Sequence, residues 1–416
     1  MTNDITTHKY RVVIIGGGAG GASVAGRLLD HRADLDIAIV EPSEYHYYQP
    51  AWTLVGGGAY DSKATRRAEA DFIPKQAKWI KQRAQGFEPE LNQVVLEDGS
   101  RIAYEYLVVA AGIQLDWTKI EGLEATLGKN GVSSNYRYDL APYTWECIRK
   151  LRGGRALFTQ PPMPIKCAGA PQKILYLAAD HFRRNGIKAE VHFLPAGPSM
   201  FGVPFYSDAL DQIMAAYGAT PNFGHNLVAV DGPHKKATFE IGAEKKHVSF
   251  DFEMMHVVPP QSAPDFIKSS PLANEAGWVA VDKNSLRHDK YANVFAVGDC
   301  TSAPNSKTAA AVRAQVPVLV SNLLAALNGK PATAAYDGYA SCPLTTSRGK
   351  VLLAEFAYGG AITPSFALDP RIPRRMYWWI KKFFLPRLYW RMLSGHMGPD
   401  WHAERKFKKP LPTLVP

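Results

Sequence analysis

Residues 10–41 decide the fold, and they read YRVVIIGGGAGGASVAGRLLDHRADLDIAIVE. An apolar run, Arg11 to Ile15, leads into a glycine-rich turn, and aliphatic residues at helical spacing follow the turn. A second apolar run, Ile37 to Val40, ends at Glu41. We predict a strand, a helix and a second strand, which together make one βαβ unit of a parallel sheet.

The glycine-rich turn carries the pattern G-x-G-x-x-G at Gly16, Gly18 and Gly21, and Gly20 lies within it. These glycines allow a tight turn, close approach of a pyrophosphate and close packing of helix on strand. The N-terminus of the helix offers free N–H groups to the phosphates. Glu41 lies where an acid accepts hydrogen bonds from an adenosine ribose. The pattern therefore favours an unphosphorylated ribose, and hence FAD or NAD.

Two later segments choose between these cofactors. Residues 104–113 read YEYLVVAAGI and residues 291–300 read YANVFAVGDC, and we predict a strand in each. The strand ends include Ala111, Gly112, Gly298 and Asp299. Flavoproteins with two dinucleotide-binding domains carry both signatures in this order, and there the aspartate binds the ribityl chain. The combination therefore indicates FAD.

A helix start, SKTAAAV, follows at residues 306–312 and includes Lys307 and Thr308. We expect its positive end to lie near the pyrimidine edge of the flavin, where it would stabilise the reduced anion. The alternative role for Asp299 is a cap of this helix.

A second βαβ unit is predicted over residues 153–194, but its first turn has lost the nucleotide pattern. The turn reads QPPMPIKCAGAPQK over residues 160–173, with no G-x-G-x-x-G. Cys167 lies near the predicted helix N-terminus, and Lys166 and Lys173 flank it. A helix N-terminus and nearby cations lower the pKa of a thiol, so the turn indicates a reactive thiolate. A buried, inert cysteine is the alternative.

The other three cysteines divide by their context. Cys342 lies in YASCPLTT, where the proline indicates a loop. Cys147 lies in a helical stretch and is interpreted as structural, and Cys300 is expected to line the flavin site without chemistry. The cysteine and histidine spacing suits no metal site. Four cysteines are too few for a disulfide-rich secreted scaffold, and the polar N-terminus shows no signal peptide, so we expect a reducing compartment.

The net charge of +10 is concentrated at the C-terminus. Residues 371–416 hold eleven Lys or Arg and two acids, so their charge is +9. Residues 376–393 read MYWWIKKFFLPRLYWRML, with seven aromatic and four basic residues and no acid. We expect Pro386 to divide them into two short helices lying on a membrane surface, and we find no apolar stretch that would span a bilayer. The alternative is a helix pair packed on the body or in a dimer contact. Nucleic acid is not expected as a partner.

Four segments resemble the sulfide:quinone oxidoreductases, in the subgroup that includes the animal mitochondrial enzyme: EYHYYQPAWTLVGGG, PIKCAGAPQK, VFAVGDCTSAPNSKTAAAVRAQ and YDGYASCPLTT. The resemblance implies a monotopic membrane flavoprotein that oxidises hydrogen sulfide and reduces ubiquinone. It implies that Cys167 and Cys342 form a redox disulfide, and it gives catalytic roles to Lys173 and Lys381. Gln49 joins the FAD-binding residues. A persulfide passes its sulfur to sulfite, glutathione or sulfide.

The fold class that follows is α/β, with two Rossmann-like domains and a C-terminal membrane-docking segment. We predict an FAD domain over 1–115 and 270–330, a second domain over 116–269, and the C-terminal segment over 331–416. The location would be the cytoplasmic face of a bacterial inner membrane, or the matrix face of the mitochondrial inner membrane in a eukaryote. A homo-oligomer is left open. The alternatives are a type II NADH:quinone oxidoreductase and a non-enzymatic flavin redox sensor.

Overall fold

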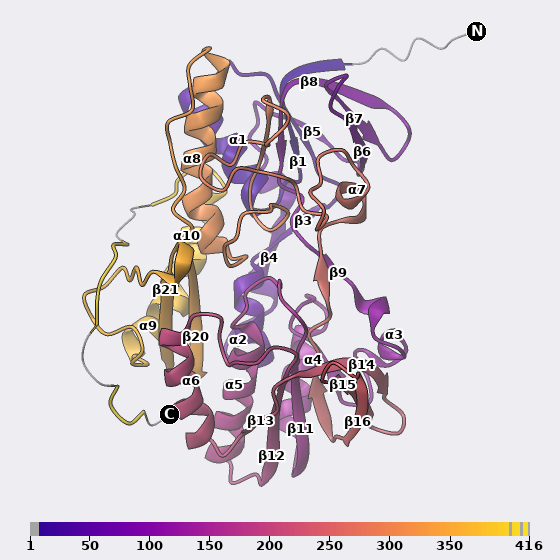
Figure 1. Ribbon diagram of the computed structural model, residues 1–416, viewed down its shortest axis with the longest axis vertical. Helices are drawn as coiled ribbons and strands as arrows, with labels where there is room; N and C mark the ends of the chain where they lie inside the picture. Colours follow the sequence, from indigo (N-terminus) through magenta and orange to yellow (C-terminus); the bar gives the residue numbers. More distant parts are fainter. Residues whose placement is uncertain (1–7, 399–401, 408–410, 415–416) are drawn as a thin grey trace.

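The computed structural model describes residues 8–398, 402–407 and 411–414, and Figure 1 shows two sheets arranged along its long axis. The first sheet has seven strands in the order β5-β2-β1-β8-β7-β6, with β19 paired to β8. Its pairs β2–β5, β1–β2, β1–β8 and β8–β19 are parallel. The strands are β1 (His8–Ile15), β2 (Ile37–Val40), β5 (Lys78–Ile80), β6 (Ala84–Glu88), β7 (Gln93–Leu96), β8 (Arg101–Val109) and β19 (Val294–Ala296). The predicted α/β class is confirmed.

Helices α1 (Ala19–His31) and α8 (Ala309–Leu327) pack together against this sheet, as Figure 1 shows. Small residues near the start of α1 let it approach the strands, and Leu28 and Leu323 contribute to the shared core. Among the described residues, α8 is the one helix that is long and apolar enough to cross a membrane. Our expectation of no such stretch was therefore wrong. One face of the helix lies in the core, where Val316, Leu319 and Val320 are wholly or almost wholly buried.

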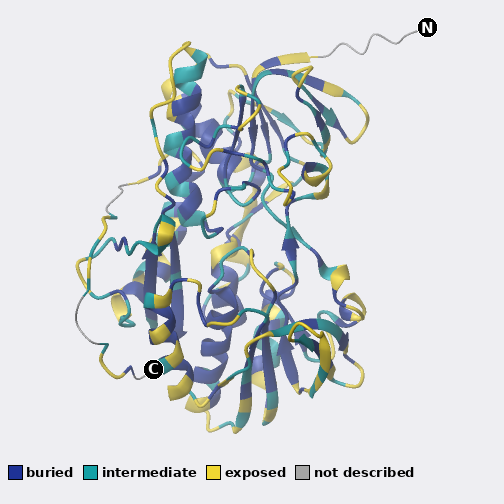
Figure 2. Cartoon of the chain, viewed as in Figure 1, coloured by how far each residue is buried: buried dark blue, intermediate teal, exposed yellow. Residues whose placement is uncertain are grey.

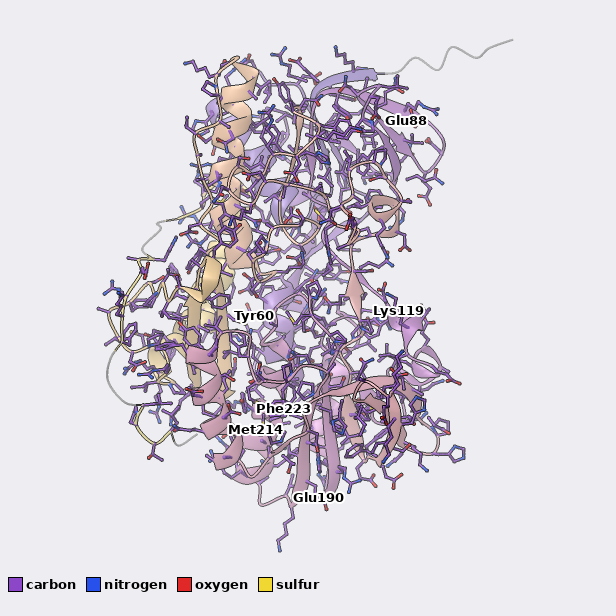
Figure 3. All side chains as sticks on the ribbon, in the orientation of Figure 1. Tyr60, Glu88, Lys119, Glu190, Met214 and Phe223 are labelled. Carbon is purple, nitrogen blue, oxygen red and sulfur yellow. The ribbon has the colours of Figure 1, made fainter. Side chains whose placement is uncertain are left out.

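The second sheet has five parallel strands in the order β10-β17-β11-β12-β13. They are β10 (Val132–Ser133), β17 (Met254–His256), β11 (Gly154–Gln160), β12 (Ala189–Pro195) and β13 (Thr220–Pro221). Around it lie α4 (Ala141–Lys150), α5 (Ala170–Arg184), α6 (Pro204–Ala216) and the antiparallel strands β14 (His225–Asp231), β15 (Lys236–Ile241) and β16 (Lys246–Asp251). In Figure 3 the labelled Glu88 and Glu190 mark opposite ends of the molecule, and Tyr60 lies between the two sheets.

Short elements join the two halves. The strand pairs are β9 (Gln114–Leu115) with β18 (Gln261–Ser262), and β3 (Tyr45–Tyr47) with β4 (Arg66–Ala68). The short helices are η1 (Gln49–Ala51), α2 (Trp52–Gly56), η2 (Lys63–Thr65), η3 (Glu69–Asp71), η4 (Trp117–Lys119), α3 (Leu123–Thr126), α7 (Asp265–Lys268) and η5 (Tyr358–Gly360).

The C-terminal segment begins with a hairpin of β20 (Ala340–Ser347) and β21 (Lys350–Phe356). Cys342 therefore lies on a strand, and the predicted loop was wrong. Pro343 suggested the loop, but a two-stranded sheet is all edge, and an edge strand tolerates a proline that has no N–H. The strand contacts α5, which brings Cys342 to the second domain.

The aromatic stretch forms α9 (Arg375–Trp379), a π-helical turn η6 (Ile380–Phe384) and α10 (Leu385–Met392), without a loop between them. Pro386 lies in the first turn of α10 and so does not divide the chain there as we expected. The wider turn before it relieves the clash that a proline ring makes with the preceding turn of an α-helix. Figure 2 shows exposed residues along these helices. Of the basic tail, Lys408 and Lys409 lie outside the described residues, as does Asp400.

Candidate active site

The glycine turn between β1 and α1 leaves room for a dinucleotide. Gly16 has φ of +100°, and a Cβ there would lie 2.6 Å from the carbonyl oxygen of Ala110. A Cβ at Gly21 would overlap the carbonyl oxygen of Gly16, whereas a Cβ at Gly18 would meet no heavy atom within 4 Å. Backbone contacts thus explain the first and last glycines, and open space at the middle one fits the close approach of a pyrophosphate.

Glu41 follows β2 and faces the same turn. Its Oε2 accepts a hydrogen bond from the N–H of Gly17 at 2.8 Å, and its Oε1 accepts one from the N–H of Ser43 at 2.7 Å. Burial raises the pKa of this carboxyl above its usual value. The carboxylate is therefore held at the edge of the turn, in the position that suits the hydroxyl groups of a ribose.

The segment before α8 brings the other predicted FAD ligands to the same edge of the sheet. Gly298 follows β19 with φ of +81°, and Gly112 follows β8 with φ of +72°, close to Ala111. Burial raises the pKa of Asp299. The side chain of Thr308 caps α8 by accepting a hydrogen bond from the N–H of Ala311 at 3.1 Å, so Asp299 is not the cap of this helix.

Lys307 is buried, and backbone oxygens hold its ammonium group. Its Nζ donates to the carbonyl oxygens of Asp299 at 2.6 Å and Thr301 at 3.1 Å, and it lies 4.0 Å from the ring centroid of Trp278. The carbonyl oxygen of Lys307 accepts from the N–H of Cys167 at 2.8 Å. The lysine thus shapes the loop that joins Asp299 to the cysteine turn.

The cysteine turn of the second domain crosses to the FAD half. Cys167 has φ of +54°, a conformation that few side-chain-bearing residues adopt. The N–H of Lys166 donates to Oε1 of Gln261 at 2.8 Å, and its Nζ donates to Oε1 of Gln49 at 2.7 Å. These contacts place the turn against the predicted FAD ligands. The Lys166–Gln49 contact was not predicted, since 117 positions separate the two residues.

The structure brings Cys167 and Cys342 together, with their Sγ atoms 3.6 Å apart. Cys342 is fully buried on β20. Gly169 allows the cysteine turn to lie close to β20. A Cβ there would lie 2.8 Å from Sγ of Cys342 and would clash with Leu344. Sequence reasoning missed this glycine, which sits in the otherwise proline-rich turn.

Lys173, one turn into α5, donates from Nζ to Sγ of Cys167 at 3.0 Å and is almost wholly buried. The hydrogen bond from Cys342 and the charge of Lys173 hold the pKa of Cys167 well below its ordinary value. The pKa of Cys342 is raised by its hydrogen bond to Cys167 and by burial. The two thiols therefore titrate together, and the pKa directions favour loss of the first proton from Cys167.

Lys381 reaches the same cluster from the π-helical turn η6. Its Nζ donates to the carbonyl oxygen of Pro343 at 2.8 Å and to Oγ1 of Thr345 at 2.7 Å. Burial and the charge of Lys173 lower its pKa well below the ordinary value. The widened turn therefore directs a buried lysine at the strand that carries Cys342.

The remaining cysteines lie apart from this pair. Burial raises the pKa of Cys147, on α4, to about 11. It also raises the pKa of Cys300 to about 11, and the thiol of Cys300 donates to the carbonyl oxygens of Val109 and Val297. Among the described residues, no three His, Cys, Asp or Glu side chains form a group that would hold a metal ion.

Comparison with known proteins shows the family. The family model for pyridine nucleotide-disulphide oxidoreductases matches residues 10–142. The mitochondrial sulfide:quinone oxidoreductase of Dictyostelium discoideum is 47% identical over 410 residues, which cover 97% of this chain and 89% of the relative. The mouse protein of the same name is 43% identical, covering 94% of this chain and 88% of the relative. The crystal structure of the Aquifex aeolicus sulfide:quinone oxidoreductase covers 94% of this chain and 93% of its own, with a TM-score of 0.76 at 20% identity, and so shares the fold. The chain therefore belongs to the sulfide:quinone oxidoreductases, a family of FAD-dependent flavoproteins.

Proposed function

We propose that this protein oxidises hydrogen sulfide at the Cys167–Cys342 pair and passes the electrons through FAD to ubiquinone. The observation that carries the proposal is the pair itself, with two Sγ atoms in contact and Lys173 on one of them. The two relatives at 43–47% identity are named for this reaction. The turn that holds Cys167 has no glycine pattern for a nicotinamide nucleotide, which argues against the NADH-dependent alternative.

The pKa of Cys167 is lowered and that of Cys342 is raised, and this difference favours attack of sulfide on one of the two sulfur atoms. In the oxidised enzyme, hydrosulfide attacks Sγ of Cys342, a new S–S bond forms, and the Cys342–Cys167 bond breaks with Cys167 leaving as a thiolate. A thiol of lower pKa leaves faster, and Lys173 lowers the pKa of Cys167. Cys342, which is fully buried, then carries the persulfide, and the thiolate lies on Cys167, in the turn that contacts the FAD half.

The cycle closes when a nucleophile takes the outer sulfur. Sulfite, glutathione or a second sulfide attacks that sulfur and expels the Cys342 thiolate, and re-forming the disulfide releases two electrons. Bound FAD would supply the two-electron acceptor for this step and the donor for the quinone. The residues we assign to its binding are Gly16, Gly18, Gly20, Gly21, Glu41, Gln49, Ala111, Gly112, Gly298, Asp299, Lys307 and Thr308.

Membrane docking through residues 376–393 belongs to the same proposal. Met376, Trp379, Phe383 and Phe384 are exposed at 38–63%, and the rings of Trp379 and Phe383 stack at 4.7 Å. Exposed aromatic side chains beside Arg387 and Arg391 suit the interface of an anionic bilayer. A lipid-soluble quinone would then enter from the membrane. Because two relatives are named mitochondrial, we propose the inner mitochondrial membrane for a eukaryotic source and the bacterial inner membrane otherwise.

Steady-state reduction of a short-chain ubiquinone tests the proposal, with sulfide or NADH as the electron donor and sulfite as the sulfur acceptor. We expect continuous turnover with sulfide and none with NADH. Turnover with NADH alone would establish the NADH:quinone alternative. A single turnover with sulfide that then stops, with each acceptor present, would establish a redox sensor.

A further inference from the structure

A buried chain of polar side chains joins the FAD half to helix α10. The hydroxyl of Tyr389, on α10, lies 2.7 Å from Nε2 of His46, on β3. The Nδ1 atom of His46 lies 3.1 Å from Oε2 of Glu69, in η3. The exposed fractions of the three residues are 7%, 4% and 2%. We call Tyr389, His46 and Glu69 the relay.

Aromatic rings enclose the relay. Phe72 meets the ring of His46 edge-on at 5.4 Å and stacks on Trp390 at 5.1 Å, while Tyr48 packs on Tyr389 at 4.7 Å. Burial raises the pKa of Tyr389, so its hydroxyl stays protonated and donates to His46. A neutral imidazole with its proton on Nδ1 satisfies both contacts. In these apolar surroundings the hydrogen bonds strengthen one another.

One end of the relay has no hydrogen-bond partner among the residues that the structure describes. Oε1 of Glu69 is buried and accepts no hydrogen bond. It lies against the glycine turn, because a Cβ placed on Gly17 would be 2.9 Å from it. The same Cβ would be 2.9 Å from Cγ of Glu41, the predicted ribose ligand. A buried carboxylate oxygen without a donor is costly, and this one lies beside the turn where the dinucleotide is expected.

We propose that a ribose hydroxyl of bound FAD donates a hydrogen bond to Oε1 of Glu69 and completes the relay. The relay then couples FAD binding to the packing of α10 against the FAD half. The hydrogen bonds then run from Tyr389 to His46, from His46 to Glu69, and from FAD to Glu69. Coupling of this kind is reciprocal, so FAD holds α10 more firmly and α10 raises the affinity for FAD. The inference rests on FAD binding and is independent of sulfide chemistry.

Tyr389→Phe tests the coupling, because it removes one hydroxyl and keeps the ring. FAD affinity is measured by adding FAD to the apoprotein and following the quenching of flavin fluorescence. We expect affinity to fall about 5- to 10-fold, the size of one buried hydrogen bond transmitted to the ligand. Tyr336→Phe is the matched control, since Tyr336 lies in the same core cluster and donates to the carbonyl oxygen of Tyr339 at 2.7 Å.

Limited trypsin digestion measures the reciprocal effect at the exposed Arg387 and Arg391. FAD should slow cleavage there in the wild type and in Tyr336→Phe, and should slow it less in Tyr389→Phe and Glu69→Gln. Unchanged FAD affinity and unchanged protection in both relay variants would overturn the proposal. An equal loss of affinity in Tyr389→Phe and Tyr336→Phe would also overturn it, because loosening of the core would explain both.

Discussion

The two βαβ units of this protein use the same turn for different chemistry. In the first, the turn from β1 to α1 is built from glycines and leaves open space at Gly18. In the second, the turn from β11 to α5 is rich in prolines and carries Cys167 shortly before the helix. Both turns present the N-terminus of a helix, which suits a phosphate in one and a thiolate in the other. One backbone architecture thus serves to hold a cofactor and to activate a nucleophile.

The largest expected effect comes from removing either thiol. Cys167→Ser and Cys342→Ser should each lower sulfide-dependent quinone reduction by about 10³-fold or more, because a nucleophile and its partner act as one unit. FAD content should stay at the wild-type level, since the glycine turn is untouched. Cys147→Ser is the control and should retain activity. Near-wild-type turnover of Cys342→Ser would mean that the second turn works without a disulfide.

Glycine substitutions separate the two turns. Gly21→Ala should prevent FAD binding, because its Cβ would overlap the backbone of Gly16. Gly169→Ala should keep FAD but lower turnover about 10²-fold, since a Cβ 2.8 Å from Sγ of Cys342 displaces the thiol. Flavin absorbance and quinone reduction are measured in parallel. Gly197→Ala, where the added carbon meets no atom within 4 Å, is the control. Loss of FAD from Gly169→Ala would show that the two turns are not independent.

Lys173→Gln tests the electrostatics of the second turn. The wild-type pKa of Cys167 is depressed, so the thiolate persists as the pH falls. Without the lysine, the midpoint of the alkylation rate against pH should move up by about 1–2 pH units, as expected for loss of an adjacent cation. The reduced enzyme is treated with iodoacetamide across the pH range. Lys188→Gln, on the exposed surface of the same domain, should leave the midpoint in place. An unmoved midpoint in Lys173→Gln would assign the activation to the hydrogen bond from Cys342 and the helix N-terminus, without Lys173.

The smallest expected effect comes from the exposed aromatic residues of the stretch 376–393. Lys381, in the same stretch, contacts the strand that carries Cys342. The double variant Trp379→Ser, Phe383→Ser should weaken binding to anionic vesicles about tenfold, because the two rings are only partly covered at the interface and contribute less than the about 1.5–3 kcal/mol that full burial of each would give. Turnover with a water-soluble quinone should change less than about twofold. Phe223→Ser, which removes an exposed aromatic residue from the second domain, is the control. Equal vesicle binding in both variants would place the membrane contact elsewhere.

Sequence patterns within short windows predicted those parts of the two turns that depend on neighbouring residues. The glycine turn, β2 and the helical position of Cys147 follow from spacing within short windows, and the structure has each of them. The strand that carries Cys342 was not predicted from local spacing. Pro343 indicates a turn, and only its pairing with Leu353 shows that it lies in a strand. The assignment of FAD ligands and the domain boundaries stay predictions.

Contacts between distant segments had no signal in the sequence. The hydrogen bond between His46 and Tyr389 joins positions 343 residues apart, and neither the segment around His46 nor the aromatic stretch that contains Tyr389 indicates that the two side chains meet. Lys381 was assigned by resemblance alone. The π-helical turn that carries it follows α9, which packs on β21, and Lys381 itself contacts β20. Such contacts arise from tertiary packing, which overrides local preference.

Anaerobic titration of the FAD-loaded enzyme tests the central claim that the second turn carries a thiol pair in place of a nicotinamide site. Sulfide or NADH is added stepwise while the flavin absorbance is recorded. We predict that sulfide bleaches the flavin, that NADH leaves it oxidised, and that Cys167→Ser abolishes the response to sulfide. Rapid bleaching by NADH, with no response to sulfide, would contradict the account.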